Sequence, residues 1–123
     1  MKLVRTLLMI FVLSGFASAE QIEKEATEVT VINPIEIPEG RLEEALGIWD
    51  KYAEYFRKQP GYLGTALHQS MDPSAKFVLI NVARWKSAEA FMSALQSEEL
   101  KAIGDGFPDE MPHYPSIYTI IRN

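Results

Sequence analysis

The stretch KFVLINVARWKSAEAFMSAL (residues 76–95) decides the fold, because two hydrophobic periods meet inside it. Up to Trp85 the residues alternate in steps of two, with Val78, Ile80 and Val82 on one side. From residue 88 onward apolar residues recur every three or four positions, as on one face of a helix. Ser87 lies at the junction, where its side-chain oxygen can cap a helix N-terminus. The stretch therefore predicts a strand that runs directly into a helix.

The strand also carries two residues that are unusual on a sheet face. Asn81 and Trp85 are four residues apart, on the side opposite Val78, Ile80 and Val82. Side chains two or four positions apart leave a strand on the same face. Asn81 and Trp85 should therefore lie on the same face of the sheet and contact the same neighbouring element or ligand.

The flanking sequence predicts the remaining elements. Alternation predicts strands at 28–37 and 61–70, and a short last strand at 116–121. Between the first two, Leu42, Ala45, Leu46, Trp49, Ala53 and Phe56 form a helical stripe. At this spacing Trp49 and Tyr52 are interpreted as core residues. The order β-α-β-β-α-β, with two amphipathic helices, predicts an α+β fold of the ferredoxin-like type: an antiparallel sheet with both helices on one face.

Two helices on one face leave the other face of the sheet open. We assign Val29, Val31, Ile35, Phe77 and Leu79 to that open face, together with Asn33, His68, Asn81 and Trp85. A contiguous apolar patch of this kind marks an interface or a ligand groove. We therefore expect a homodimer through the open faces, with a cavity between sheet and helices or between protomers.

Each polar residue of that face has an alternative interpretation. Asn33 precedes Pro34, which cannot donate to a ladder, so Asn33 can belong to a β-bulge instead of a pocket. His68 can simply be exposed near a strand end. Asn81 can pair with a neighbour at a dimer interface.

The N-terminus has the features of a secretory signal peptide. Lys2 and Arg5 precede a short apolar run, and Ala17-Ser18-Ala19 is a small-residue cleavage site. The run is shorter than the roughly 20 residues of a membrane span. We predict a signal peptide at 1–19 cleaved after Ala19, a disordered leader at 20–27 and one domain at 28–122. A periplasmic or secreted bacterial protein is expected, with no membrane attachment after cleavage.

The charge and the Cys and His content of the chain limit the kinds of molecule that it can bind. Removing 19 of 123 residues leaves 104, with 10 Lys and Arg against 17 Asp and Glu, a net charge of −7. An acidic domain is a poor binder of nucleic acid. The chain has no Cys and only two His, 45 residues apart, so no metal-ligand spacing is present. We expect no nucleic-acid partner, no metal and no organic cofactor.

Several motifs together resemble the antibiotic biosynthesis monooxygenase domain of the dimeric α/β-barrel superfamily. They are Asn33-Pro34, Ile37-Pro-Glu-Gly40 before a helix with Trp49, Gln59-Pro-Gly-Tyr-Leu63, Leu67-His68, Ala83-Arg-Trp85-Lys-Ser87-Ala-Glu-Ala-Phe91 and Tyr114-Pro-Ser-Ile-Tyr118. The resemblance covers roughly residues 28–122. It implies a dimeric α/β barrel and oxidation of an aromatic substrate by oxygen, with the protein positioning the substrate anion and stabilising its charge.

The resemblance also implies site residues. Asn81 and Trp85 match the catalytic Asn and Trp of this strand, and Asn33, His68 and Phe91 are the expected substrate-binding residues. Some members have a Tyr at the position of Phe91, which can donate neither a proton nor a hydrogen bond. Haem-degrading members place an axial His near the position of Gly104, and His113 lies further along, in a Pro-rich loop.

Two functions from different classes remain. The first is an exported, cofactor-independent monooxygenase-type enzyme that acts on a small aromatic or quinol substrate. The second is a non-catalytic dimer, a binding or stress-related protein, that takes up a small apolar or aromatic molecule. Haem degradation is the less favoured third alternative.

Overall fold

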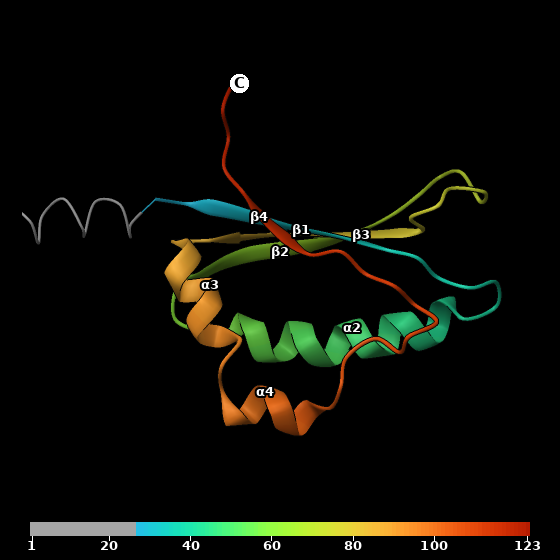
Figure 1. The fold of residues 1–123 in the computed structure, drawn as a ribbon, viewed down its shortest axis with the longest axis horizontal. Coiled ribbons are helices and arrows are strands. Elements are labelled where there is room, and N and C mark those ends of the chain that lie inside the picture. Colours follow the sequence, from blue (N-terminus) through green and yellow to red (C-terminus); the bar gives the residue numbers. More distant parts are fainter. Residues whose placement is uncertain (1–26) are drawn as a thin grey trace, which may run out of the picture.

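The computed structural model describes residues 27–123, so the expected signal peptide and nearly all of the expected leader lie outside the described residues. The elements are β1 (Val29–Ile35), α2 (Leu42–Arg57), β2 (Tyr62–Gln69), β3 (Leu79–Trp85), α3 (Ala88–Ala94), α4 (Glu98–Ile103) and β4 (Ser116–Tyr118). The predicted order of strands and helices is confirmed, with the second helical region divided into α3 and α4 (Figure 1).

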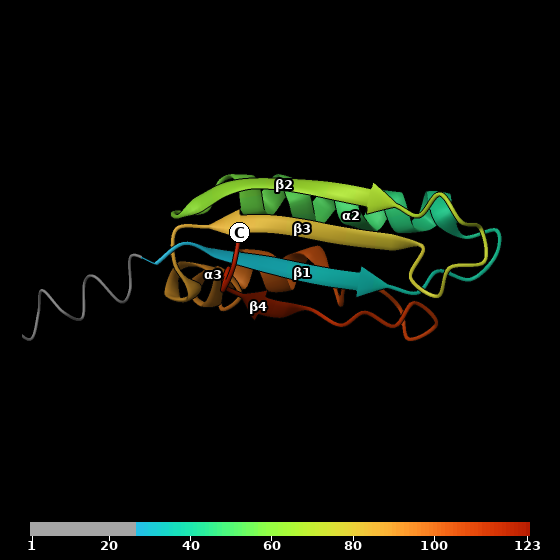
Figure 2. The ribbon, with the colours of Figure 1, turned by 90° about the horizontal axis from the view of Figure 1, so that it is seen from above.

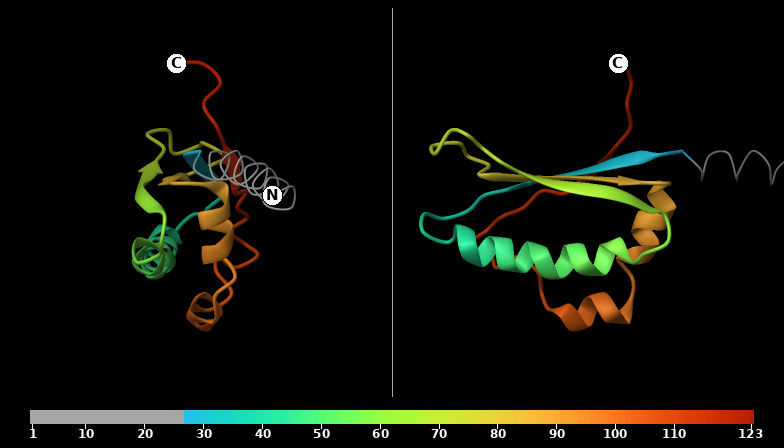
Figure 3. Two further views of the ribbon diagram at one scale, coloured as in Figure 1. Left: turned by 90° about the vertical axis from the view of Figure 1, so that its left-hand side faces the viewer. Right: turned by 180° about the vertical axis from the view of Figure 1, so that it is seen from behind.

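The four strands form one antiparallel sheet in the order β2-β3-β1-β4, as Figure 2 shows from above. Helices α2, α3 and α4 lie on the same side of this sheet (Figures 1 and 3). This is the ferredoxin-like α+β fold that the sequence predicts. Ser87 also has its predicted role, because its side chain accepts a hydrogen bond from the backbone N–H of Ala90 at 3.0 Å and so caps α3.

The assignment of residues to the two faces of the sheet was wrong. Val29, Val31, Ile35, Leu79 and Trp85 are buried on the face that the helices cover. The same face carries Asn33 and Asn81, which are paired in the β1–β3 ladder. Alternation separates a strand into two sets of residues but does not say which set meets the helices. Both sets of β3 are apolar, so hydrophobicity could not decide.

A β-bulge in β2 reverses which residues of that strand face the helices. Tyr62 pairs with Trp85 and Gly64 pairs with Arg84, so Leu63 is an extra residue in the strand. Beyond the bulge, Thr65 and Leu67 lie on the helix-covered side. His68 pairs with Ile80 and is exposed on the open side. The expectation that His68 shares a face with Asn33, Asn81 and Trp85 was therefore wrong.

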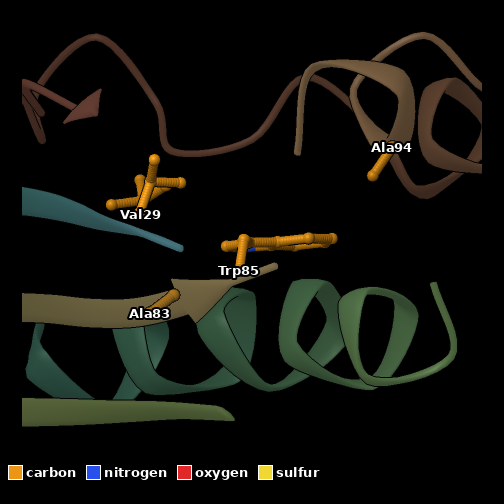
Figure 4. Packing of buried hydrophobic residues seen from close by; sticks show 5 residues of the cluster. Val29, Ala83, Trp85 and Ala94 are labelled. Atoms are coloured by element: carbon orange, nitrogen blue, oxygen red, sulfur yellow. The ribbon is translucent and has the colours of Figure 1, made fainter. Parts of the chain in front are cut away.

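The core consists of two clusters between sheet and helices. Figure 4 shows Val29, Ala83, Trp85 and Ala94 of the cluster near α3. The buried residues of the other cluster are Ile35, Ala45, Leu79 and Met111. One cluster packs the sheet against the helices near α3, and the other packs the sheet against the N-terminal part of α2.

The open face of the sheet is half-buried and apolar at its centre. The ladder places Ile32 beside Val82, and Ile80 lies two residues further along β3. The chain end projects from this side of the sheet (Figures 1 and 3), and Ile120 and Ile121 there are 74% and 83% exposed. None of the helices in residues 27–123 is long and apolar enough to cross a membrane.

Candidate functional site

A cavity of about 580 Å³ lies between the helix-covered face of the sheet and the helices. Strands β1, β2 and β3 form its floor, α2 and α3 contribute its walls, and the segment 106–117 borders it. The predicted site residues Asn33, Asn81, Trp85 and Phe91 all line this cavity, whereas His68 does not. The structure thus brings four of the five together, on the face opposite the one we expected.

One end of the cavity has an aromatic wall centred on Trp85. The Trp85 ring meets Phe56, Tyr62 and Phe91 at centroid distances of 5.8, 5.7 and 5.4 Å. The side chain is 1% exposed, and its indole Nε1 is buried without a hydrogen-bond partner among the described residues. Phe56 and Tyr62 meet the Trp85 ring edge to face, and Phe91 meets it at a tilt. Phe91 therefore contributes aromatic packing surface and no hydroxyl.

Asn81 lies in the middle of the cavity floor, and its amide orientation is fixed by two donors. Its Oδ1 accepts hydrogen bonds from Trp49 Nε1 at 3.0 Å and from Thr65 Oγ1 at 2.9 Å. Indole Nε1 can only donate, so the amide atom facing it must be the oxygen. The amide nitrogen takes part in neither bond. Asn81 can therefore present two N–H groups to a bound molecule.

Trp49 and Tyr52 were expected in the core, but both line the cavity. Trp49 is half-buried and orients Asn81, so it is part of the site. The Tyr52 hydroxyl donates to the carbonyl oxygen of Gly104 at 2.9 Å. Burial is the main cause that raises the pKa of Tyr52, and the nearby charge of Asp105 adds to it. Tyr52 therefore stays protonated at neutral pH.

Asn33 joins β1 to the C-terminal segment. Its Oδ1 accepts a hydrogen bond from the backbone N–H of Tyr114 at 3.0 Å. The β1–β3 ladder runs regularly through Asn33, so the alternative of a bulge at this position is excluded. The Tyr114 hydroxyl donates to Glu36 Oε2 at 2.8 Å, and this bond raises the pKa of Tyr114.

His113 was missed as a site residue. It lies 80 residues from Asn33 in the sequence, yet it forms a bridge with Ile35 at the end of β1 and lines the cavity. Only a signal for long-range backbone pairing could have placed it there. Its ring lies 5.6 Å from that of Phe107.

The described residues of the cavity wall carry no full charge. None of those that line it is Asp, Glu, Lys or Arg. Within residues 27–123 no group of three or more His, Cys, Asp or Glu could hold a metal ion. Apolar walls with a few neutral donors fit a flat aromatic molecule that carries oxygen atoms.

Fold and cavity define a ferredoxin-like α+β protein with a ligand-sized pocket under its helices. Residues 28–105 match the model of the antibiotic biosynthesis monooxygenase family. The chain belongs to this family, as its motifs predicted.

Solved structures agree with this assignment. A candidate monooxygenase from Shewanella loihica PV-4 is 39% identical, with 79% of this chain and 97% of that chain covered and a TM-score of 0.71. SnoaB, a cofactor-independent oxygenase from Streptomyces nogalater, is 21% identical over 80% of this chain and 97% of its own, with a TM-score of 0.67.

A third structure is a point mutant of MhuD, solved with two manganese protoporphyrin IX molecules per active site. It is 23% identical over 77% of this chain and 96% of its own, with a TM-score of 0.62. At these identities SnoaB and MhuD share the fold with this chain. A search of curated proteins found no match.

Proposed function

We propose that this protein is an exported monooxygenase-type enzyme that oxidises a small phenol or quinol with molecular oxygen. The observation that carries the proposal is the uncharged cavity with an aromatic wall around Trp85 and an oriented amide at Asn81. Membership of the monooxygenase family supports the reaction type. Export rests on the signal-like sequence at residues 1–19.

The reaction balances without a further reductant. A phenol or quinol with a C–H carbon ortho or para to one hydroxyl reacts with one O₂ to give a quinone and one water. One oxygen atom becomes the new carbonyl oxygen at that carbon, and the other leaves as water with the phenolic hydrogen and the hydrogen of that carbon. The substrate supplies all of the electrons, first from its phenolate anion to O₂. The protein must therefore hold the ring, stabilise the phenolate and admit oxygen.

The side chains divide this work along the cavity. Phe56 and Phe91 hold the aromatic ring system at one end, and the buried Trp85 ring packs behind them and keeps them in place. Asn81 lies four residues from Trp85, roughly 13 Å along the strand. Its amide N–H groups donate to the phenolate oxygen. Trp49 and Thr65 keep the Asn81 amide in the donating orientation.

Oxygen uptake tests the proposal directly. The purified protein is mixed with a panel of hydroquinones and polycyclic phenols, and oxygen consumption and quinone absorbance are followed. We expect turnover that falls about tenfold or more in Trp85→Ala, because Phe56 and Phe91 lose the ring that keeps them in place. Trp85→Phe keeps most of the packing and serves as the folded control. No turnover by the wild-type protein, or full turnover by Trp85→Ala, contradicts the proposal.

The alternative is a non-catalytic dimer that binds an apolar or aromatic molecule. The Phe91 side chain favours it, because this position offers no hydroxyl to a reacting substrate. Native mass spectrometry of protein purified from its own compartment separates the two functions. A small aromatic molecule retained without any oxygen uptake supports binding alone.

A further inference from the structure

The described lining of the cavity contains one imidazole. The chain has two His, and His68 is exposed on the opposite face of the sheet. The described lining residues include no carboxylate, Lys or Arg, and the Tyr52 hydroxyl is committed to Gly104. Histidine is the side chain that most readily accepts a proton near neutral pH. Within this lining, His113 alone has that chemistry.

Backbone hydrogen bonds hold His113 in place from both sides. On one side, the Glu36 N–H donates to the carbonyl oxygen of Pro112 at 2.8 Å. On the other, the Tyr114 N–H donates to Pro34 O at 3.1 Å and to Asn33 Oδ1 at 3.0 Å. The residue is thus attached to the end of β1 in spite of lying in a loop. A positioned proton acceptor needs this kind of support.

The ring has one long polar contact, and the residue itself is exposed. His113 Nδ1 lies 3.4 Å from the carbonyl oxygen of Met111, which can only accept a hydrogen bond. Nδ1 therefore carries the hydrogen in this contact. The neutral imidazole then has its free lone pair on Nε2. Nε2 is the atom able to take a proton from a bound molecule.

The register of the sheet places His113 on one side of β1 and Asn81 on the other. His113 bridges Ile35, and Asn33, two residues along β1, pairs with Asn81. Their backbones are therefore separated by roughly 6.6 Å along the strands and roughly 9.6 Å across them, and a bound molecule between them can meet both side chains. Trp85 pairs with Val29, six residues from Ile35, or roughly 20 Å. The cavity thus has an aromatic end at Trp85 and a polar end where Asn33, Asn81 and His113 gather.

We propose that His113 is the general base of the site and takes the phenolic proton of the substrate at the polar end of the cavity. This inference rests on the proposed oxidation of a phenol or quinol. The phenolic O–H bond breaks, the electron pair stays on oxygen, and an N–H bond forms at Nε2. The resulting phenolate accepts hydrogen bonds from Asn81 Nδ2 and gives its electron to O₂. The imidazolium returns the proton to the oxygen atom that leaves as water.

The first test compares turnover of two histidine variants. His113→Gln keeps a polar side chain of similar size but cannot accept the proton, so turnover of an ordinary quinol should fall about 100-fold or more. His68→Gln, on the opposite face, should leave turnover unchanged. A phenol acidic enough to be ionised at the assay pH needs no base, and its oxidation should be equal in wild type and His113→Gln. Equal loss for both substrates overturns the inference.

The second test does not need turnover. Para-nitrophenol absorbs differently as phenol and as phenolate, so its spectrum reports the proton when the dye is bound. We expect wild type and His68→Gln to raise the phenolate fraction above that of free dye at the same pH, and His113→Gln to abolish this rise. A dye that ionises equally with wild type and His113→Gln, or keeps its free-solution spectrum with both, overturns the inference.

The two tests separate the inference from the proposed function. If wild type consumes no oxygen with any phenol but ionises the dye only when His113 is present, the monooxygenase proposal fails and the base assignment stands. If wild type turns over quinols and His113→Gln does so equally, the base assignment fails and the monooxygenase proposal stands.

Discussion

At the scale of single residues, Asn81 is the side chain on which the polar end of the cavity depends. Its Oδ1 accepts from Trp49 and Thr65. Asn81→Leu leaves the Trp49 indole without its acceptor, whereas Thr65 Oγ1 keeps a second acceptor, the carbonyl oxygen of Val82 at 3.3 Å. An unsatisfied donor costs about 1–3 kcal/mol. We expect the free energy of unfolding, measured by urea denaturation, to fall by about that amount.

A second substitution checks the cause of this loss. Trp49→Phe removes the donor, so adding it to Asn81→Leu should cost less than Trp49→Phe costs alone. Strictly additive losses would contradict the assigned hydrogen bond.

The residues of the site differ in how far the sequence could place them. Asn33, Asn81 and Trp85 share a face because each strand alternates, and the family motifs include all three. Trp49 was taken for core because a helical stripe does not distinguish a packed side chain from a cavity wall. His113 could not be placed, because it reaches the site through hydrogen bonds between β1 and the segment 112–114.

At the scale of elements, the sequence predicted the order of strands and helices and the cap at Ser87, since these depend on local periods. It did not predict which face of the sheet meets the helices. That depends on the docking of elements far apart in the chain, and both faces of β3 are apolar enough to be covered.

The turn between α2 and β2 packs against α3 at Gly61. Gly61 has φ +87°, and a Cβ there would lie 2.5 Å from Ala90 Cβ. Gly61→Ala adds this clash to the strain of a positive φ, so it should destabilise by about 1–3 kcal/mol more than the strain alone.

Gly40→Ala is the matched control for Gly61→Ala. Gly40 has φ +80°, but a Cβ added there would have no atom within 4 Å, so only the strain applies. Thermal unfolding of the two variants checks the difference. Equal melting temperatures would mean that α3 moves aside without cost.

At the scale of the whole molecule, we propose a homodimer that covers the open face of the sheet. The residues that first suggested a dimer lie under the helices, but the face that the helices leave free still carries Ile32, Ile80 and Val82. The C-terminal segment, which includes the exposed Ile120 and Ile121, projects from the same side (Figure 1). A contiguous apolar face of this kind marks an interface.

Sizing of the purified protein at micromolar concentration should give the mass of two chains. Val82→Glu places a charge in the centre of the face and should shift the mass to one chain. Met71→Glu adds the same charge in an exposed turn and should leave the dimer intact. A wild-type monomer would contradict the proposal.

The bulge at Leu63 gives β2 one position where its length can change without turning either face of the sheet. Tyr62 and Gly64 already pair with the adjacent residues Trp85 and Arg84, so a chain lacking Leu63 would join them in a regular ladder. Thr65 would stay beneath the helices and His68 outside. A deletion further along β2, away from the bulge, would turn the residues that follow it to the opposite faces of the sheet. Evolution can therefore remove the codon for Leu63 from this scaffold and leave the cavity intact. Related chains with and without this residue can have the same strands beneath the cavity.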